Sequence, residues 1–245
     1  MRQSSFMEAF SLSIKSCVSV VGSGGKSTLI RQLARETSKH GNPVVITTTT
    51  HIELPFLSEN EEMMLATSGK INMPLFFQQK REQPLILIHK KLSEHKAQGF
   101  SPEALCPVTG KQLLLIEADG SRRKPFKIPA NWEPVICSET SHAIIVCGLN
   151  ALNQPFNNKW VHRSHLDTKH SSDITPHDVA RIISTPCYYL DKFPKNCSVF
   201  VYLSGCIDNS HYLAAKEIAK CISKITSSIT TFTGNITKSP WIEKL

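Results

Sequence analysis

Short runs of apolar residues alternate along this chain with longer stretches in which apolar side chains recur every three or four positions. A continuous apolar run of about four to eight residues is typical of a strand that is covered on both faces. The three-to-four-residue spacing is typical of a helix with one buried face. Strands that alternate with helices predict a parallel sheet with crossover helices, and therefore an α/β fold.

The pattern places these elements along most of the chain. The predicted strands cover about residues 16–21, 43–48, 85–89, 113–118, 143–148 and 199–203. The predicted helices cover about residues 26–39, 175–183 and 210–225. Pro176 suits the first turn of its helix, because proline has no N–H to leave unpaired there. Residues 153–172 are predicted to form a long polar loop, and residues 54–84 show no clear pattern.

The first predicted strand runs directly into a glycine-rich turn, Gly22-Ser23-Gly24-Gly25, which continues as Lys26-Ser27-Thr28 at the start of a helix. Glycine allows a tight turn with converging N–H groups, and the helix N-terminus adds partial positive charge. In a phosphate-binding loop of this kind, the lysine reaches the terminal phosphates and the next hydroxyl ligates Mg²⁺. We therefore expect these seven residues to bind a nucleoside triphosphate, either ATP or GTP.

The spacing in this turn departs from the usual G-x-x-x-x-G-K-[ST] pattern. Val20 stands where the first glycine of that pattern would be, so the match is to a shorter G-x-x-G-K-[ST] form. Strand, glycine turn and helix follow one another as the phosphate-binding loop requires. The alternative interpretation is a structural glycine turn that is followed by an incidental lysine.

Two carboxylates, Glu117 and Asp119, stand at the end of the apolar run 113–118. Because they are two residues apart, both point to one face for as long as the strand persists. An acid in this place holds Mg²⁺ or orients an attacking water. We expect Ser27 with Glu117 or Asp119 to hold Mg²⁺, and the sequence leaves open which acid serves the metal. The alternative is a pair of carboxylates in an exposed turn.

Basic residues follow these acids immediately, at Arg122, Arg123, Lys124 and Lys127. They could neutralise phosphate charge during transfer or bind a second anionic substrate, and a solvated basic loop is the equal alternative. We take the catalytic candidates to be Lys26, Glu117, Asp119, Arg122 and Arg123.

Three weaker signals concern the nucleotide base, metals and substrates. Guanine-specific NTPases usually carry N-K-x-D after a late strand, and here only Asp208 matches, either as a base contact or as a helix cap. The His-rich segment 162–177 could bind a transition metal, and a mobile substrate loop is the alternative, with Arg163 as an anion contact. The run TTTTH at 47–51 could contribute a Mg²⁺ ligand or a substrate contact, or be simply a strand rich in threonine.

Composition and charge narrow the range of partners. The chain has 245 residues, of which 40% are hydrophobic and 20% charged, as in an ordinary globular protein. No apolar run approaches the roughly 18–20 residues of a membrane span, and no signal peptide is evident, so we expect a cytoplasmic protein without a membrane partner. The net charge of +8 is divided equally between residues 1–140 and 141–245, with no basic tail, which argues against a nucleic-acid partner. Eight cysteines without a C-x-x-C pair are expected to be reduced and structural.

The order VVGSGGKST, VVITTTTHI, LLLIEADGSRRKPFKIPANWEPVI and a VHR segment resembles the YqeC-like proteins over roughly residues 14–210. Proteins of this kind are named as accessory proteins of selenium-dependent hydroxylases. The resemblance implies an α/β fold of the P-loop NTPase-like type, a three-layer sandwich with a mostly parallel central sheet. It also implies a role beside a molybdenum hydroxylase or the enzymes that modify its cofactor. It implies no particular reaction.

Together these observations predict a single domain over residues 1–245, with roughly residues 1–13 and 236–245 peripheral. The predicted function is nucleotide binding by an NTPase that assists maturation or cofactor insertion of a selenium-dependent molybdenum hydroxylase. Two alternatives stay open. One is a small-molecule kinase that transfers the γ-phosphate to a cofactor or metabolite, and the other is a non-catalytic nucleotide-sensing module.

Overall fold

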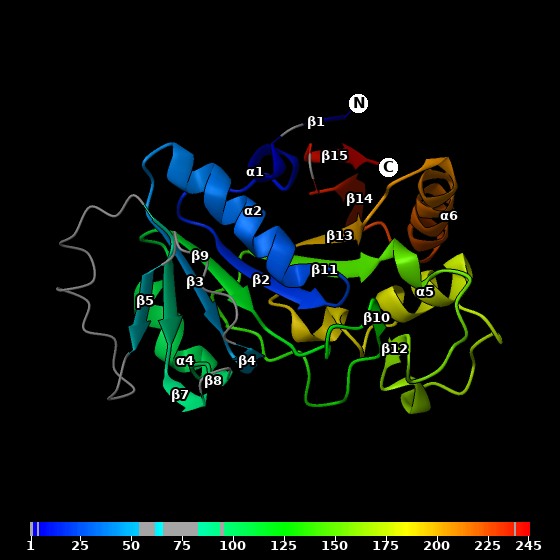
Figure 1. The fold of residues 1–245 in the computed structure, drawn as a ribbon, viewed down its shortest axis with the longest axis horizontal. Helices are drawn as coiled ribbons and strands as arrows, with labels where there is room; N and C mark the ends of the chain where they lie inside the picture. The colour runs from blue at the N-terminus through cyan, green and yellow to red at the C-terminus, as the bar shows by residue number, and fades with distance from the viewer. Residues whose placement is uncertain (1, 4, 54–61, 66–82, 94–95, 238) are drawn as a thin grey trace.

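A large, mostly parallel sheet forms the centre of the protein (Figure 1). The computed structural model describes residues 2–3, 5–53, 62–65, 83–93, 96–237 and 239–245. Most of the segment 54–84, for which the pattern predicted no element, lies outside these residues. Within the described residues the chain is an α/β protein, as the alternating apolar pattern predicted.

The central sheet has ten strands in the order β1-β15-β14-β13-β11-β2-β9-β3-β6-β5 within the described part of the chain. Its parallel strands are β2 (Cys17–Gly22), β3 (Val44–Thr48), β5 (Glu62–Leu65), β6 (Leu85–Ile88), β9 (Leu113–Glu117), β11 (His142–Gly148), β13 (Ser198–Ser204) and β14 (Ile229–Asn235). The two antiparallel strands at one edge are β15 (Trp241–Lys244) and β1 (Arg2–Gln3). Because the parallel strands run the same way, their carboxyl ends meet at one edge of the sheet.

Helices and two small sheets complete the described structure. The helices are α1 (Phe6–Ala9), α2 (Lys26–Lys39), α4 (Pro102–Leu105), α5 (Pro176–Ser184) and α6 (Asn209–Ile225), with 3₁₀ turns η1 (Cys106–Val108), η2 (Leu149–Ala151), η3 (Ser164–Leu166) and η4 (Leu190–Lys192). The small sheets are β4 (His51–Glu53), β7 (Lys90–Ser93) and β8 (Lys96–Gln98), and β10 (Phe126–Lys127) with β12 (Val161–His162). The three predicted helices are confirmed as α2, α5 and α6 within one residue at each end. No helix in the described ranges has both the length and the apolar character needed to cross a membrane.

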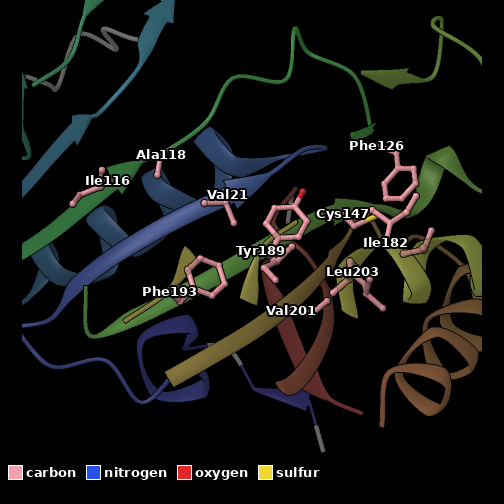
Figure 2. Packing of buried hydrophobic residues seen from close by; sticks show 14 of the residues in the cluster. Val21, Ile116, Ala118, Phe126, Cys147, Ile182, Tyr189, Phe193, Val201 and Leu203 are labelled. Atoms are coloured by element: carbon pink, nitrogen blue, oxygen red, sulfur yellow. The ribbon is translucent and has the colours of Figure 1, made fainter. Parts of the chain in front are cut away.

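Side chains of the central strands alternate between two cores, one on each face of the sheet. In β2, Val18 and Val20 pack in the core that includes α1 and α2, whereas Cys17 and Val21 belong to the opposite core. Figure 2 shows part of that opposite core, in which Val21 lies beside Tyr189, whereas Ile182 of α5 lies near Cys147 and Leu203. Helices therefore cover both faces, and they leave the carboxyl edge of the sheet to the loops.

The two ends of the chain, which the sequence predicted to be peripheral, contribute buried side chains to the fold. Phe6 and Phe10 of the N-terminal segment are fully buried, and both make edge-to-face contacts with Tyr202 of β13. At the other end, Ile242 of β15 is also fully buried. These elements have four residues each, so their hydrophobic pattern is too short to reveal them before the rest of the core is known.

Replacing Phe10 tests whether the N-terminal segment is part of the core. We expect Phe10→Ala to lower the free energy of unfolding by about 3–5 kcal/mol, because it leaves a cavity against β13 and β14. Urea titration followed by circular dichroism measures this change. Ile14→Ala is the matched control, since Ile14 is 46% exposed, and it should change stability by about 0.5 kcal/mol or less. Equal effects of the two substitutions would contradict this packing.

Candidate functional site

The glycine turn between β2 and α2 lies at the carboxyl edge of the central sheet, and its backbone requires glycine at two positions. Gly22 has a φ of +89° and Gly24 a φ of +81°, a region that other residues rarely adopt. A Cβ atom on Gly22 would lie 2.2 Å from the carbonyl oxygen of Val146, and one on Gly24 would lie 2.4 Å from the amide nitrogen of Gly148. The turn is therefore clamped against the end of β11.

Lys26, the first residue of α2, folds back over this turn. Its ammonium group donates to the carbonyl oxygen of Gly22 at 2.7 Å and pairs with Asp119 at 3.0 Å and Glu117 at 3.6 Å. Its side chain is almost completely buried. Burial opposes the positive charge, but the carboxylates of Asp119 and Glu117 outweigh it and raise the pKa of Lys26. The lysine is thus held charged at the mouth of the turn.

Asp119 connects this lysine to a second buried cation. Its Oδ2 atom accepts from the N–H of Gly22 at 2.9 Å and from the ammonium group of Lys127 at 2.9 Å. Burial of the carboxyl would raise its pKa, yet the charges of Lys26 and Lys127 outweigh this and hold the pKa of Asp119 below its usual value. Asp119 therefore fixes the turn and the lysine at the same time.

The ion pairs continue outward from Lys127. This fully buried ammonium group also contacts Glu133 at 2.8 Å and the carbonyl oxygen of Gly120 at 2.7 Å. Glu133 in turn accepts from Arg163, whose guanidinium lies 5.4 Å from the ring of the exposed Trp132. A chain of alternating charges thus leads from the glycine turn to the surface.

Glu117 has a different environment from Asp119. It ends β9, and its Oε2 atom accepts from the hydroxyl of Ser27 at 2.9 Å. Its side chain is 16% exposed, whereas that of Asp119 is fully buried. Ser27 and Glu117 therefore form a pair of oxygen ligands that is open to solvent at the N-terminus of α2.

A cavity of about 520 Å³ opens beside the turn. Its wall includes Gly24 and Thr28, the hydroxyl-bearing Tyr202, and the amides of Asn150 and Asn235. Tyr202 is fully buried, and its hydroxyl has no hydrogen-bond partner within the described part of the chain. The cavity therefore continues from the glycine turn along the ends of β11, β13 and β14, and it offers polar groups that can accept a ligand.

Comparison with known proteins identifies the family. The model of the YqeC protein family matches residues 18–165, which include the glycine turn, both acids and Glu133. This chain belongs to the YqeC family. An Escherichia coli (strain K12) relative described as "Uncharacterized protein YqeC" is 33% identical over 154 residues, which cover 60% of this chain and 57% of the relative. The match thus spans little more than half of that relative's length. No solved structure matches the chain.

The basic segment of this YqeC family member divides between the surface and the interior. Arg122 and Arg123 are exposed and have left-handed backbone conformations, with φ of 49° and 58°, and Arg123 lines the cavity beside the turn. Lys124 donates to Asn158 at 2.8 Å. Lys127 points inward to Asp119, so the segment is not a single basic surface and Lys127 is not in a position to meet phosphates.

The weaker sequence signals have structural partners of their own. Asp208 caps α6 by accepting from the N–H of His211 at 2.9 Å. It also lines a second cavity of about 590 Å³ that shares Ile207 and Asn235 with the first.

The threonine run and the His-rich segment also have local partners. The hydroxyls of Thr48 and Thr49 donate to backbone carbonyls at 2.7 Å. The pKa of His162 is lowered to about 4, mainly because the ring is partly buried and also because the positive charges of Lys127 and Arg163 are nearby. Across the described residues, no group of three His, Cys, Asp or Glu side chains could hold a metal ion.

Lys127 provides a test of the buried ion chain. We expect Lys127→Met to lower the free energy of unfolding by about 3–5 kcal/mol, because it removes the cation that Asp119 and Glu133 share in the interior. Urea titration measures this loss. Lys124→Met is the matched control at a partly exposed position, where a change of about 0.5 kcal/mol is expected. A loss at Lys127 no larger than at Lys124 would show that the ion chain does not stabilise the fold.

Proposed function

We propose that this YqeC family member has a P-loop NTPase-like fold and binds a nucleoside triphosphate with Mg²⁺ at the glycine turn. The observation that carries the proposal is the 2.9 Å hydrogen bond between Ser27 and Glu117, directly beside the buried ammonium group of Lys26. A lysine, a hydroxyl and a carboxylate at a helix N-terminus are the groups that phosphate-binding loops use.

Phosphate would bind here by exchanging partners with groups that are already in place. The ammonium group of Lys26 contacts Asp119 and the Gly22 carbonyl oxygen, and an incoming phosphate would offer this group a stronger acceptor. Asp119 would keep Lys127 and the Gly22 N–H after this exchange, so its charge stays compensated. The first N–H groups of α2 have no acceptor within the helix, and they would bind phosphate oxygens as well.

Ser27 and Glu117 fit the requirements of a Mg²⁺ site, because both are hard oxygen ligands and one of them is partly open to solvent. Bound Mg²⁺ would neutralise phosphate charge. Asp119 fits this role less well, since its carboxylate is fully buried and engaged by Lys26, Lys127 and the Gly22 N–H. We therefore assign Mg²⁺ binding to Ser27 and Glu117, and the positioning of Lys26 to Asp119.

The nucleoside would occupy the cavity beside the turn. This cavity adjoins Gly24, Gly25 and Thr28, and a volume of about 520 Å³ is in the range of small-molecule sites. The unpartnered hydroxyl of Tyr202 and the amide of Asn235 are groups that could pair with a ribose or a base. Asp208 lies in the adjoining cavity, so this arrangement does not by itself distinguish ATP from GTP.

Hydrolysis of the nucleotide is the reaction that we propose, with Arg122 or Arg123 near the transferred phosphate. Arg123 supports this assignment best, because it lines the same cavity as the glycine turn. The biological setting, maturation of a selenium-dependent molybdenum hydroxylase or insertion of its cofactor, is supported only by the resemblance to YqeC-like proteins. Transfer of the phosphate to a small molecule, and binding without turnover, are the competing outcomes of the assay below.

Nucleotide titration of the purified protein tests the binding site. We expect ATP or GTP to bind with Mg²⁺, and Lys26→Ala to weaken binding about 10- to 100-fold through loss of a charged hydrogen bond worth about 1.5–3 kcal/mol. Isothermal titration calorimetry measures both affinities. Lys15→Ala, at an exposed lysine that precedes β2, is the matched control and should bind as the wild type does. Unchanged affinity in a folded Lys26→Ala protein would refute the phosphate site.

Turnover assays test the reaction. We expect slow, Mg²⁺-dependent phosphate release, and Glu117→Gln should reduce its rate at least about tenfold, because a neutral amide binds the metal less well than a carboxylate. Release of inorganic phosphate with time provides the readout, and removal of Mg²⁺ with EDTA should abolish it. Transfer of labelled phosphate to an added small molecule would favour the kinase. Nucleotide binding with no turnover under any condition would favour the sensing module.

A further inference from the structure

Three cysteines gather at the end of β2 that is far from the glycine turn, where the proposed function does not use them. They are Cys17 at the start of β2, Cys106 at the start of η1, and Cys137 in the connection between β10 and β11. Cys17 and Cys137 are buried, with 2% and 0% exposure, whereas Cys106 is exposed. All of the cysteines in the described structure are free thiols.

The three thiols contact one another through Cys137. Cys137 and Cys106 donate to the same acceptor, the carbonyl oxygen of Pro102, at 3.6 Å and 3.9 Å. A hydrogen bond from Cys17, together with the N–H of Glu139 and the thiol of Cys106, outweighs burial and lowers the pKa of Cys137. Burial and the charge of Cys137 raise the pKa of Cys106. A solvent-exposed thiol thus lies next to a buried thiol whose pKa is lower.

We propose that Cys106 and Cys137 are a peroxide-sensitive dithiol pair that closes into a disulfide. Cys106 is the sulfur that meets the oxidant, because it alone of the three is exposed. Cys137 is the resolving sulfur, because it is sheltered from solvent yet adjacent to Cys106.

The chemistry proceeds in two balanced steps with hydrogen peroxide as the oxidant. In the first, Cys106 releases its proton and its thiolate attacks peroxide, an S–O bond forms as the O–O bond breaks, and Cys106 becomes a sulfenic acid while the departing hydroxide takes up the proton and leaves as water. In the second, the Cys137 thiolate attacks that sulfur, an S–S bond forms as the S–O bond breaks, and hydroxide takes up the proton that Cys137 released to become water. Two thiols are oxidised, and one peroxide is reduced to two waters.

The disulfide would close a loop around the residues of the candidate site. The chain between Cys106 and Cys137 contains β9 with Glu117, then Asp119 and Lys127. A cross-link across this segment restricts its unfolded conformations and so favours the folded state. Oxidation would therefore raise the thermal unfolding midpoint. The proposal is independent of nucleotide binding and can fail without affecting it.

Peptide mapping of the full chain tests the pair. The wild type is treated with hydrogen peroxide, its remaining thiols are alkylated, and it is digested without reductant. We expect a peptide pair joined through Cys106 and Cys137, which dithiothreitol separates, and a higher unfolding midpoint than that of the reduced protein. Cys187→Ser, at another exposed cysteine, should leave the cross-link intact as the matched control.

Single substitutions assign the order of the steps. Cys137→Ser should stop the reaction at the sulfenic acid, so that dimedone labels Cys106. Cys106→Ser should leave Cys137 reduced and open to alkylation after unfolding. Absence of the cross-link in the oxidised wild type, a cross-link between Cys17 and Cys137 in its place, or a cross-link that survives Cys106→Ser would overturn the proposal.

Discussion

The contact between the buried ammonium group of Lys127 and the carboxylate of Asp119 supports the rest of the candidate site. Asp119 is fully buried, and removing a carboxylate from water costs several kcal/mol unless cations and N–H groups surround it. Lys127 supplies this compensation from one side, which leaves Asp119 able to hold the Gly22 N–H and Lys26 on the other. Through this pair, Asp119 joins the turn to its lysine, in addition to the contacts that Lys26 makes with the Gly22 carbonyl and Glu117.

This arrangement also joins parts of the chain that are far apart in sequence. Lys26 follows β2, Asp119 follows β9, and Arg163 reaches Glu133 from the segment after β12. Within this network each cation lies beside a carboxylate, so each buried charge has an opposite charge close by. The shape of the candidate site therefore depends on a polar interior network that extends well beyond the local glycine motif.

Sequence patterns predicted the elements whose signals are local. The glycine turn, α2 and the position of Glu117 at the end of a strand follow from adjacent residues, and the structure has them where expected. The direction of Lys127 could not be predicted in this way. It stands three residues after Lys124 in one basic segment, and only the pairing of β10 with β12 turns it inward. The same limit applies to α1 and β15, which become recognisable only when their partners in the core are known.

Parallel strands also determine how this protein can change over evolution. The loops after β2, β9, β11, β13 and β14 all begin at one edge of the sheet, and all five contribute to the cavity beside the glycine turn, through Gly24, Arg123, Asn150, Ile207 and Ile236 in that order. The two cores lie behind this edge, and of the residues that line the cavity only Tyr202 is also a member of a core in the described structure. Substitutions in the loops can thus alter which ligand is preferred without repacking the interior. Relatives with the same scaffold could in this way diverge in specificity while they keep the glycine turn and its acids.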